Sequence, residues 1–255
     1  MGRAIWKGYI HFEDVDVPVK LHNAVKENRI QFHLLHEPDR VRLKQQMVCA
    51  YENVPVPAEE QTRGFELEEG KYILIDVEEL EQTEPENSRI IEVQEFVKAD
   101  QIDSLFLDRV YYLEQDIPSG WYNALVQVLR EMGVLGVCTW TMRKRSYVGV
   151  LGVGDKILRL TSLRYADEVI PMKSLSYQSI PLTEKEIKIG SDLIEQLTGP
   201  FEPGKFENEH QKRLQNLIDM KIRGEKITIL RPKRMKPTAP DKLLEVLEAS
   251  LKKTA

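Results

Sequence analysis

The chain has 255 residues, of which 42% are hydrophobic and 30% are charged, a composition typical of a globular protein with one large domain and room for a small appendage. It carries a net charge of −5, and its sequence contains neither an apolar run long enough to span a membrane nor the apolar core of a signal peptide. Its two cysteines, Cys49 and Cys138, cannot form a disulfide framework, so we expect a cytoplasmic protein.

The first predicted element is a β-hairpin. Apolar residues occupy alternate positions from Trp6 to Phe12 and again from Val15 to Leu21, which places them on one face of each strand. The acidic dipeptide Glu13-Asp14 supplies a short turn between the two strands. The chain therefore begins as a β protein.

Further short strands are predicted at 30–34, 40–44, 71–75, 89–93, 109–113, 135–142, 147–153 and 156–163. The segment 49–64 interrupts them with prolines, acidic residues and little periodicity, which indicates an excursion from the main sheet. Asp76 and Glu79 have the spacing of a capping box, and apolar residues at helical spacing precede Gly133, so two helices are expected there. Many short strands with few helices favour a barrel or a sandwich.

The character of the sequence changes near Pro181, where helices replace strands. Thr183 and Glu186 form a second capping box, and a further helix is expected from about Asn208 to Gly224. Residues 231–236 form a basic linker, and 241–252 has the leucine spacing of a last amphipathic helix. The first two of these helices bury little surface alone, so we expect them to dock on the barrel or on a partner.

Charge is segregated along the chain although its overall sign is negative. Acidic residues concentrate at 59–60, 66–69 and 78–86, and basic residues concentrate at 40–44, 143–145 and 231–236. Affinity for a phosphate backbone depends on the local field, so a chain of net negative charge can still bind nucleic acid. The simpler interpretation of each run, that it is a solvated surface of mixed sign, stays open.

Several blocks of sequence follow one another in the order found in one protein family. The blocks are Trp6-Lys7-Gly8-Tyr9-Ile10, Val17-Pro18-Val19-Lys20-Leu21, Phe32-His33-Leu34-Leu35-His36, Gly64-Phe65-Glu66, Gly70-Lys71-Tyr72, Leu163-Arg164-Tyr165-Ala166-Asp167 and Leu197-Thr198-Gly199-Pro200. Through these matches, spread from Ile5 to about Ile222, the chain resembles bacterial Ku, a family of DNA-end-binding proteins.

The resemblance implies a mainly β fold with some α: a Ku-type β-barrel with a protruding, DNA-encircling arm, followed by a small helical C-terminal region. The barrel core would span residues 1–180 with the arm inserted at about 40–70, the helical region 181–230, and the basic linker with the terminal helix 231–255.

The resemblance also implies a function in non-homologous end-joining repair. The expected protein is a ring-shaped homodimer that threads onto double-stranded DNA ends without reading their sequence. Its C-terminal region would recruit and stimulate an ATP-dependent, multifunctional DNA ligase. The expected location is the cytoplasm, in association with the nucleoid.

If the chain encircles DNA, cationic side chains should contact phosphates rather than base edges. Arg40, Arg42 and Lys44 alternate with apolar residues on the strand predicted at 40–44, so they would point the same way, although a charged edge strand that prevents aggregation would look the same. Lys7 and Lys20 are secondary candidates, because the opening hairpin is expected to build the barrel floor. The expected DNA-binding residues are Arg40, Arg42, Lys44, Arg63, Lys71, Arg143, Lys144 and Arg145.

No metal site, cofactor or catalytic residue is predicted. Many members of the resembled family carry a Cys-x-x-Cys pair, which here is Cys49-Ala50-Tyr51-Glu52, and one thiolate beside Glu52 makes a poor zinc site. Cys138 is expected to pack as a small apolar residue. His33 and His36 would lie on opposite faces of a strand, so we interpret them as packed or hydrogen-bonded core residues rather than ligands.

The sequence has no phosphate-binding glycine loop in a strand-to-helix context and no nucleophile elbow, so we expect the protein not to be an enzyme. The alternative function is a soluble β-barrel protein-interaction scaffold that does not bind DNA.

Overall fold

The computed structural model describes residues 3–86, 88–178 and 181–224, so the linker expected at 231–236 and the helix expected at 241–252 lie outside the described residues. The strands are β1 (Trp6–Phe12), β2 (Val15–Asn23), β3 (Arg63–Glu68), β4 (Lys71–Ile75), β5 (Ile90–Lys98), β6 (Leu107–Gln115), β7 (Val134–Met142), β8 (Arg145–Gly154) and β9 (Ile157–Leu163). The α-helices are α1 (Val77–Thr83), α2 (Gly120–Met132), α3 (Glu184–Leu197) and α4 (Glu209–Ile222). The chain divides into two units, one ending at Met172 and the other beginning at Lys173.

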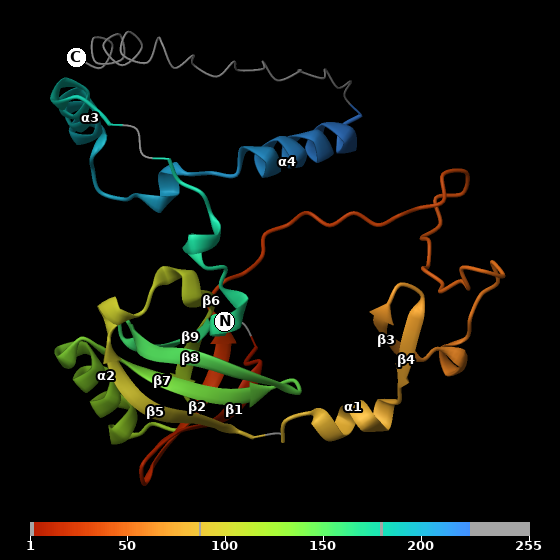
Figure 1. Ribbon diagram of the computed structural model, residues 1–255, viewed down its shortest axis with the longest axis horizontal. Coiled ribbons are helices and arrows are strands. Elements are labelled where there is room, and N and C mark those ends of the chain that lie inside the picture. Colours follow the sequence, from red (N-terminus) through yellow and green to blue (C-terminus); the bar gives the residue numbers. More distant parts are fainter. Residues whose placement is uncertain (1–2, 87, 179–180, 225–255) are drawn as a thin grey trace. The chain divides into compact units, whose positions relative to one another are not determined.

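The first unit is built on a closed barrel of seven strands in the order β1-β2-β6-β9-β8-β7-β5 (Figure 1). The neighbouring strands are antiparallel except where β1 pairs with β5, and that parallel pair closes the barrel. The predicted mainly β barrel with a few helices is therefore confirmed. Strands β3 and β4 form a separate two-stranded sheet.

The alternation seen in the sequence explains the barrel interior. Val17, Val19 and Leu21 of β2 are completely buried, whereas Lys20 between them is partly exposed, as expected for a strand with one buried face. Ile10 of β1 is also completely buried, so the predicted opening hairpin is confirmed on both strands. Burying one such side chain contributes about 1.5–3 kcal/mol, and every barrel strand supplies at least one buried residue.

Helix α2 packs on the barrel through buried residues that include Tyr122, Leu125 and Leu129. Ser119 caps its N-terminus, and Gly133 ends it in the left-handed conformation, with φ of 64°. The buried Tyr122 hydroxyl donates to the carbonyl of Leu113 on β6 at 2.6 Å and accepts from the amide of Leu158 on β9 at 3.1 Å. Because Leu113 and Leu158 are paired residues of neighbouring strands, this hydroxyl ties the helix to both at once.

A glycine permits a close approach of backbones where β1 meets the start of β5. A Cβ added at Gly8 would lie 2.1 Å from the Arg89 carbonyl oxygen and 2.2 Å from the Trp6 ring. The next residue, Tyr9, donates its amide to that same Arg89 carbonyl at 2.8 Å. Gly8 is therefore needed for the register that holds the start of β5 against β1.

The chain leaves the barrel after Asn23 and returns at Ile90, and we call residues 24–89 the arm. The arm contains the β3–β4 hairpin and α1, which begins with the predicted capping box of Asp76 and Glu79. Every residue of β3 is exposed, as are all but the last of β4. A two-stranded sheet of this kind is marginal without a covering partner.

The strands predicted at 30–34 and 40–44 are wrong. Only one isolated bridge, between Leu35 and Arg42, occurs there, and it is closed by a turn in which the His36 amide donates to the Val41 carbonyl at 2.8 Å. Arg40 lies in this turn with a left-handed φ of 60°, which is incompatible with a strand. Alternation alone suggested strands, but no neighbouring strand is available in this part of the arm to complete a ladder.

The second unit carries α3 and α4. Both helices begin as predicted, α3 with the capping box of Thr183 and Glu186 and α4 with Asn208 as its N-cap. Neither helix contains a buried residue, so their apolar positions lack a core of their own. Among the residues that the structure describes, no helix is long and apolar enough to cross a membrane.

Candidate nucleic-acid interface

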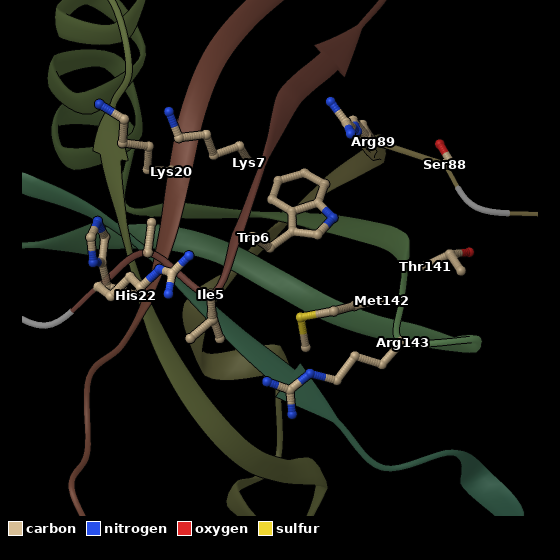
Figure 2. A pocket seen from close by; sticks show the side chains of 12 residues that line it. Ile5, Trp6, Lys7, Lys20, His22, Ser88, Arg89, Thr141, Met142 and Arg143 are labelled. Carbon is tan, nitrogen blue, oxygen red and sulfur yellow. The ribbon is translucent and has the colours of Figure 1, made fainter.

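One end of the barrel carries a basic hollow of about 800 Å³ (Figure 2). We use the name basic hollow for this cavity and its lining. The lining residues are Arg3, Ala4, Ile5, Trp6, Lys7, Lys20, His22, Ser88, Arg89, Thr141, Met142 and Arg143. Five of them are arginine or lysine and none is a carboxylate, so the lining concentrates positive charge in a concave surface.

The barrel topology brings these residues together from four places in the sequence. The start of β1 supplies Trp6 and Lys7, and the end of the antiparallel β2 supplies Lys20. Arg89 directly precedes β5, which is parallel to β1, and Arg143 lies in the turn after β7. The basic hollow thus lies at the barrel end where the arm both leaves and returns.

The cations of the basic hollow differ in how far they are neutralised. Lys20 Nζ lies 2.6 Å and Lys7 Nζ 3.6 Å from the carboxylate of Asp116. Hydrogen bonding to Asp116 raises the pKa of Lys20, and the same contact lowers the pKa of Asp116. Within the described ranges, Arg89 and Arg143 have no ion-pair partner, and neither has Arg3, which shares the lining with them. These three arginines therefore carry the uncompensated charge.

The predicted basic run at 143–145 is divided among different environments. Arg143 and Lys144 form the two-residue turn between β7 and β8, and both have positive φ, at 52° and 62°. Arg143 lines the basic hollow, whereas Lys144 Nζ lies 2.7 Å from Glu84 and 3.9 Å from Glu81. The Glu84 carboxylate raises the pKa of Lys144, so this lysine stays charged but is already paired. The third member of the run opens β8 with an exposed side chain.

The remaining candidates lie on the arm, away from the lining of the basic hollow. All of them are exposed, and the set is Arg40, Arg42, Lys44, Arg63 and Lys71. Lys71 pairs with Glu68 at 2.6 Å across the β3–β4 hairpin, which reduces its free charge. Because 40–44 is not a strand, the expectation that its three cations share one strand face is wrong.

Sequence reasoning missed Arg3 and Arg89 and ranked Lys7 and Lys20 as secondary. The apolar residues of the opening hairpin build the barrel, as expected, and its cations Lys7 and Lys20 line the basic hollow. Trp6 lies among them, with its ring directed toward the side of Arg89 (Figure 2). The sequence did contain a signal that could have identified these cations as site residues. Each of them lies near the end of a predicted strand, and side chains from several strands meet at the end of a barrel.

The two cysteines lie in different environments. Cys138 is buried and donates its thiol to the Gly149 carbonyl, as predicted for a packed residue, and burial raises its pKa to about 12. Backbone amides of Glu52 and Tyr51 lower the pKa of the partly exposed Cys49. In the described part of the chain, no three histidine, cysteine or acidic residues gather into a possible metal site.

The interpretation of His33 and His36 as core residues is wrong. His33 is exposed, and His36 is exposed although its Nδ1 lies 2.9 Å from Asp39. The Val41 amide and the His36 ring together lower the pKa of that carboxylate. Both histidines belong to the arm, which offers no core at this point.

Comparison with known proteins gives one consistent result. The Ku70/Ku80 beta-barrel domain family matches residues 11–189. The chain is similar to "Non-homologous end joining protein Ku 2" of Geotalea uraniireducens (strain Rf4), at 67% identity over 254 residues that cover 100% of this chain and 99% of that protein. It is also similar to "Non-homologous end joining protein Ku" of Koribacter versatilis (strain Ellin345), at 33% identity over 98% of this chain and 84% of that protein. A third relative, of the same name from Heliobacterium modesticaldum (strain ATCC 51547 / Ice1), is 35% identical over 98% of this chain and 91% of its own length.

Proposed function

We propose that this chain, which belongs to the Ku β-barrel family, binds the ends of double-stranded DNA in non-homologous end joining. The observation that carries the proposal is the basic hollow, which lies where the arm leaves and rejoins the barrel. Three of its arginines, Arg3, Arg89 and Arg143, have no ion-pair partner among the described residues. Cations in a concave surface bind DNA phosphates and displace the counterions condensed on the DNA. Contacts to phosphates carry no direct information about base sequence. The protein would therefore bind ends of any sequence.

We further propose that two copies form the ring. The arm exposes aromatic and aliphatic side chains on its hairpin, among them Phe65, Tyr72 and Leu74. A hairpin this apolar gains stability when a second surface covers it, and a second copy of the same chain is the simplest partner for a closed assembly. Two arms and two barrels would then surround one duplex, with the basic hollows facing its backbone.

The third part of the proposal concerns a ligase. Helices α3 and α4 present apolar residues without a core, among them Ile187, Ile194 and Ile222. We propose that this unit and the basic linker recruit an ATP-dependent, multifunctional DNA ligase and stimulate it. On this view the protein itself performs no chemistry and needs no cofactor, and it acts in the cytoplasm at the nucleoid.

End binding and dimerisation are tested with the full chain. In a mobility-shift titration at low salt, a short blunt duplex should be retarded, and unrelated sequences of the same length should bind equally well. Sedimentation of the free protein should give twice the chain mass of 29.6 kDa. Failure to retard any linear duplex would favour the alternative, a protein-interaction scaffold that does not bind DNA.

The ligase role predicts a separable defect. A chain that ends at Gly224 should retain most of its affinity for linear duplex, because the basic hollow is intact, but should stimulate end ligation by a partner ligase less than the full chain does. The measurements are ligated product over time and duplex affinity, made on both chains. Unchanged stimulation would exclude the basic linker and the residues after it from ligase recruitment and leave α3 and α4 as the proposed contact.

A further inference from the structure

Two neighbouring cations of the β7–β8 turn have different partners. Arg143 lines the basic hollow, where no carboxylate faces it, and Lys144 is held between Glu84 and Glu81 of the arm. The two lysine contacts measure 2.7 Å and 3.9 Å. A duplex that enters the basic hollow therefore meets an available arginine and a lysine whose charge is already neutralised.

The arm needs a cation at this place. Glu81 and Glu84 are three residues apart at the C-terminal end of α1, so they are neighbours on the helix surface. The C-terminal end of a helix carries a partial negative charge, which makes carboxylates unfavourable there, and α1 has no basic residue in its own last turn. Lys144 supplies the missing positive charge from the barrel.

The turn that carries Lys144 is costly for these residue types. A two-residue hairpin turn with positive φ at both positions favours asparagine and glycine, because other residues lose about 1–2 kcal/mol in the left-handed conformation. Here arginine and lysine occupy both positions. Such strain persists where the surrounding structure fixes the side chains in useful positions, and the two different partners provide that reason.

The position of α1 also determines how the arm returns to the barrel. The helix ends at Thr83, and β5 begins at Ile90, so only a short connection separates the Glu84 contact from the barrel. That connection contains Ser88 and Arg89, which line the basic hollow. A contact that fixes α1 therefore also limits where Arg89 can lie.

We infer that Lys144 is a positioning residue: by pairing with Glu84 and Glu81 it fixes the returning limb of the arm against the barrel turn and so places Arg89 for DNA, without touching DNA itself. This inference rests on the proposed DNA-end binding. The expected effect on DNA affinity has an unusual sign. Removal of a carboxylate normally strengthens binding to DNA, whereas removal of the Glu84 carboxylate should weaken it.

The test measures affinity for a short blunt duplex at several salt concentrations. Lys144→Gln and Glu84→Gln should each weaken binding about two- to fivefold and leave the slope of log affinity against log salt unchanged. Arg143→Gln should instead reduce that slope by about 0.9, as expected when one phosphate is no longer neutralised. Lys144→Arg should bind like the wild type, and Glu84→Lys introduced into Lys144→Glu should restore the affinity that the single variant loses.

Glu86→Gln is the matched control, since it removes the same charge two residues further along the chain. It should bind at least as tightly as the wild type. If Glu84→Gln also binds as tightly as the wild type or tighter, the pairing does not place Arg89 and the inference is overturned. If Lys144→Gln reduces the salt slope as Arg143→Gln does, Lys144 contacts DNA and the inference is overturned as well.

Amide hydrogen exchange of α1, measured without DNA, separates this inference from the proposed function. Both Lys144→Gln and Glu84→Gln should speed exchange at the end of α1, and Glu86→Gln should not. If the wild-type protein binds no linear duplex, the proposed function fails, and the inferred role of Lys144 fails with it even where exchange shows that the pairing exists. If the wild type binds DNA but exchange in α1 is unchanged in both variants, only the inference fails.

Discussion

Covalently closed circular DNA should bind at least on the order of a hundredfold more weakly than a linear duplex of the same sequence at the same salt concentration. Both molecules offer the same phosphates to the basic hollow, so charge alone predicts equal affinity. A closed ring, however, can be entered only by a free end. The acidic residues Glu78, Glu79 and Glu81 of α1 and its C-cap residue Glu84 would also disfavour contact with the side of a duplex.

The experiment compares a relaxed closed circle with the same circle cut once. Titration by mobility shift should show retardation of the cut molecule alone, and sealing the ends after binding should trap protein on the circle even when excess linear competitor is added. Equal affinity for the two forms before sealing would exclude threading. The control is a cut circle with both ends blocked by bulky hairpins, which should behave like the closed form.

Removal of the three unpaired arginines of the basic hollow should nearly abolish end binding. Arg3→Gln, Arg89→Gln and Arg143→Gln together should weaken affinity for linear duplex by at least on the order of a thousandfold, because each charge-assisted hydrogen bond to phosphate contributes about 1.5 kcal/mol or more. The slope of log affinity against log salt should fall by about 0.9 for each phosphate that the variant no longer neutralises. Because all three side chains line a surface cavity, the thermal midpoint should change little.

A second triple variant provides the matched control. Lys98→Gln, Arg130→Gln and Lys156→Gln remove the same charge from exposed positions that do not line the basic hollow. This control should retain nearly all of the wild-type affinity and salt slope. If both triple variants lose affinity equally, net charge rather than the basic hollow determines binding.

Local sequence patterns predicted much of the fold. The alternation in Trp6–Phe12 and Val15–Asn23 identified β1 and β2, because each strand has one buried face. Capping boxes at Asp76 and Thr183 identified the starts of α1 and α3, because a cap involves only residues within one turn. The segment 40–44 shows the limit of this reasoning, since a strand needs a neighbour that the local sequence does not reveal.

The candidate site was harder to predict than the fold. Arg3, Lys20, Arg89 and Arg143 are far apart in sequence and meet because β1 pairs with both β2 and β5, and β5 pairs with β7, in the closed barrel. The basic run at 143–145 was recognised, but its composition could not show that Lys144 faces the acidic end of α1. The basic runs included Arg143 but not Arg3, Lys7, Lys20 or Arg89, because long-range strand pairing rather than local composition brings these cations together.

The closure of the barrel by β1 and β5 has an evolutionary consequence. All seven barrel strands come from outside residues 24–89, so the arm contributes no strand to the closed sheet. Insertions, deletions and substitutions in the segment between the two ends of the arm can therefore accumulate without removing a strand from the barrel. Selection can adjust the length and the charge of the arm while the barrel stays the same.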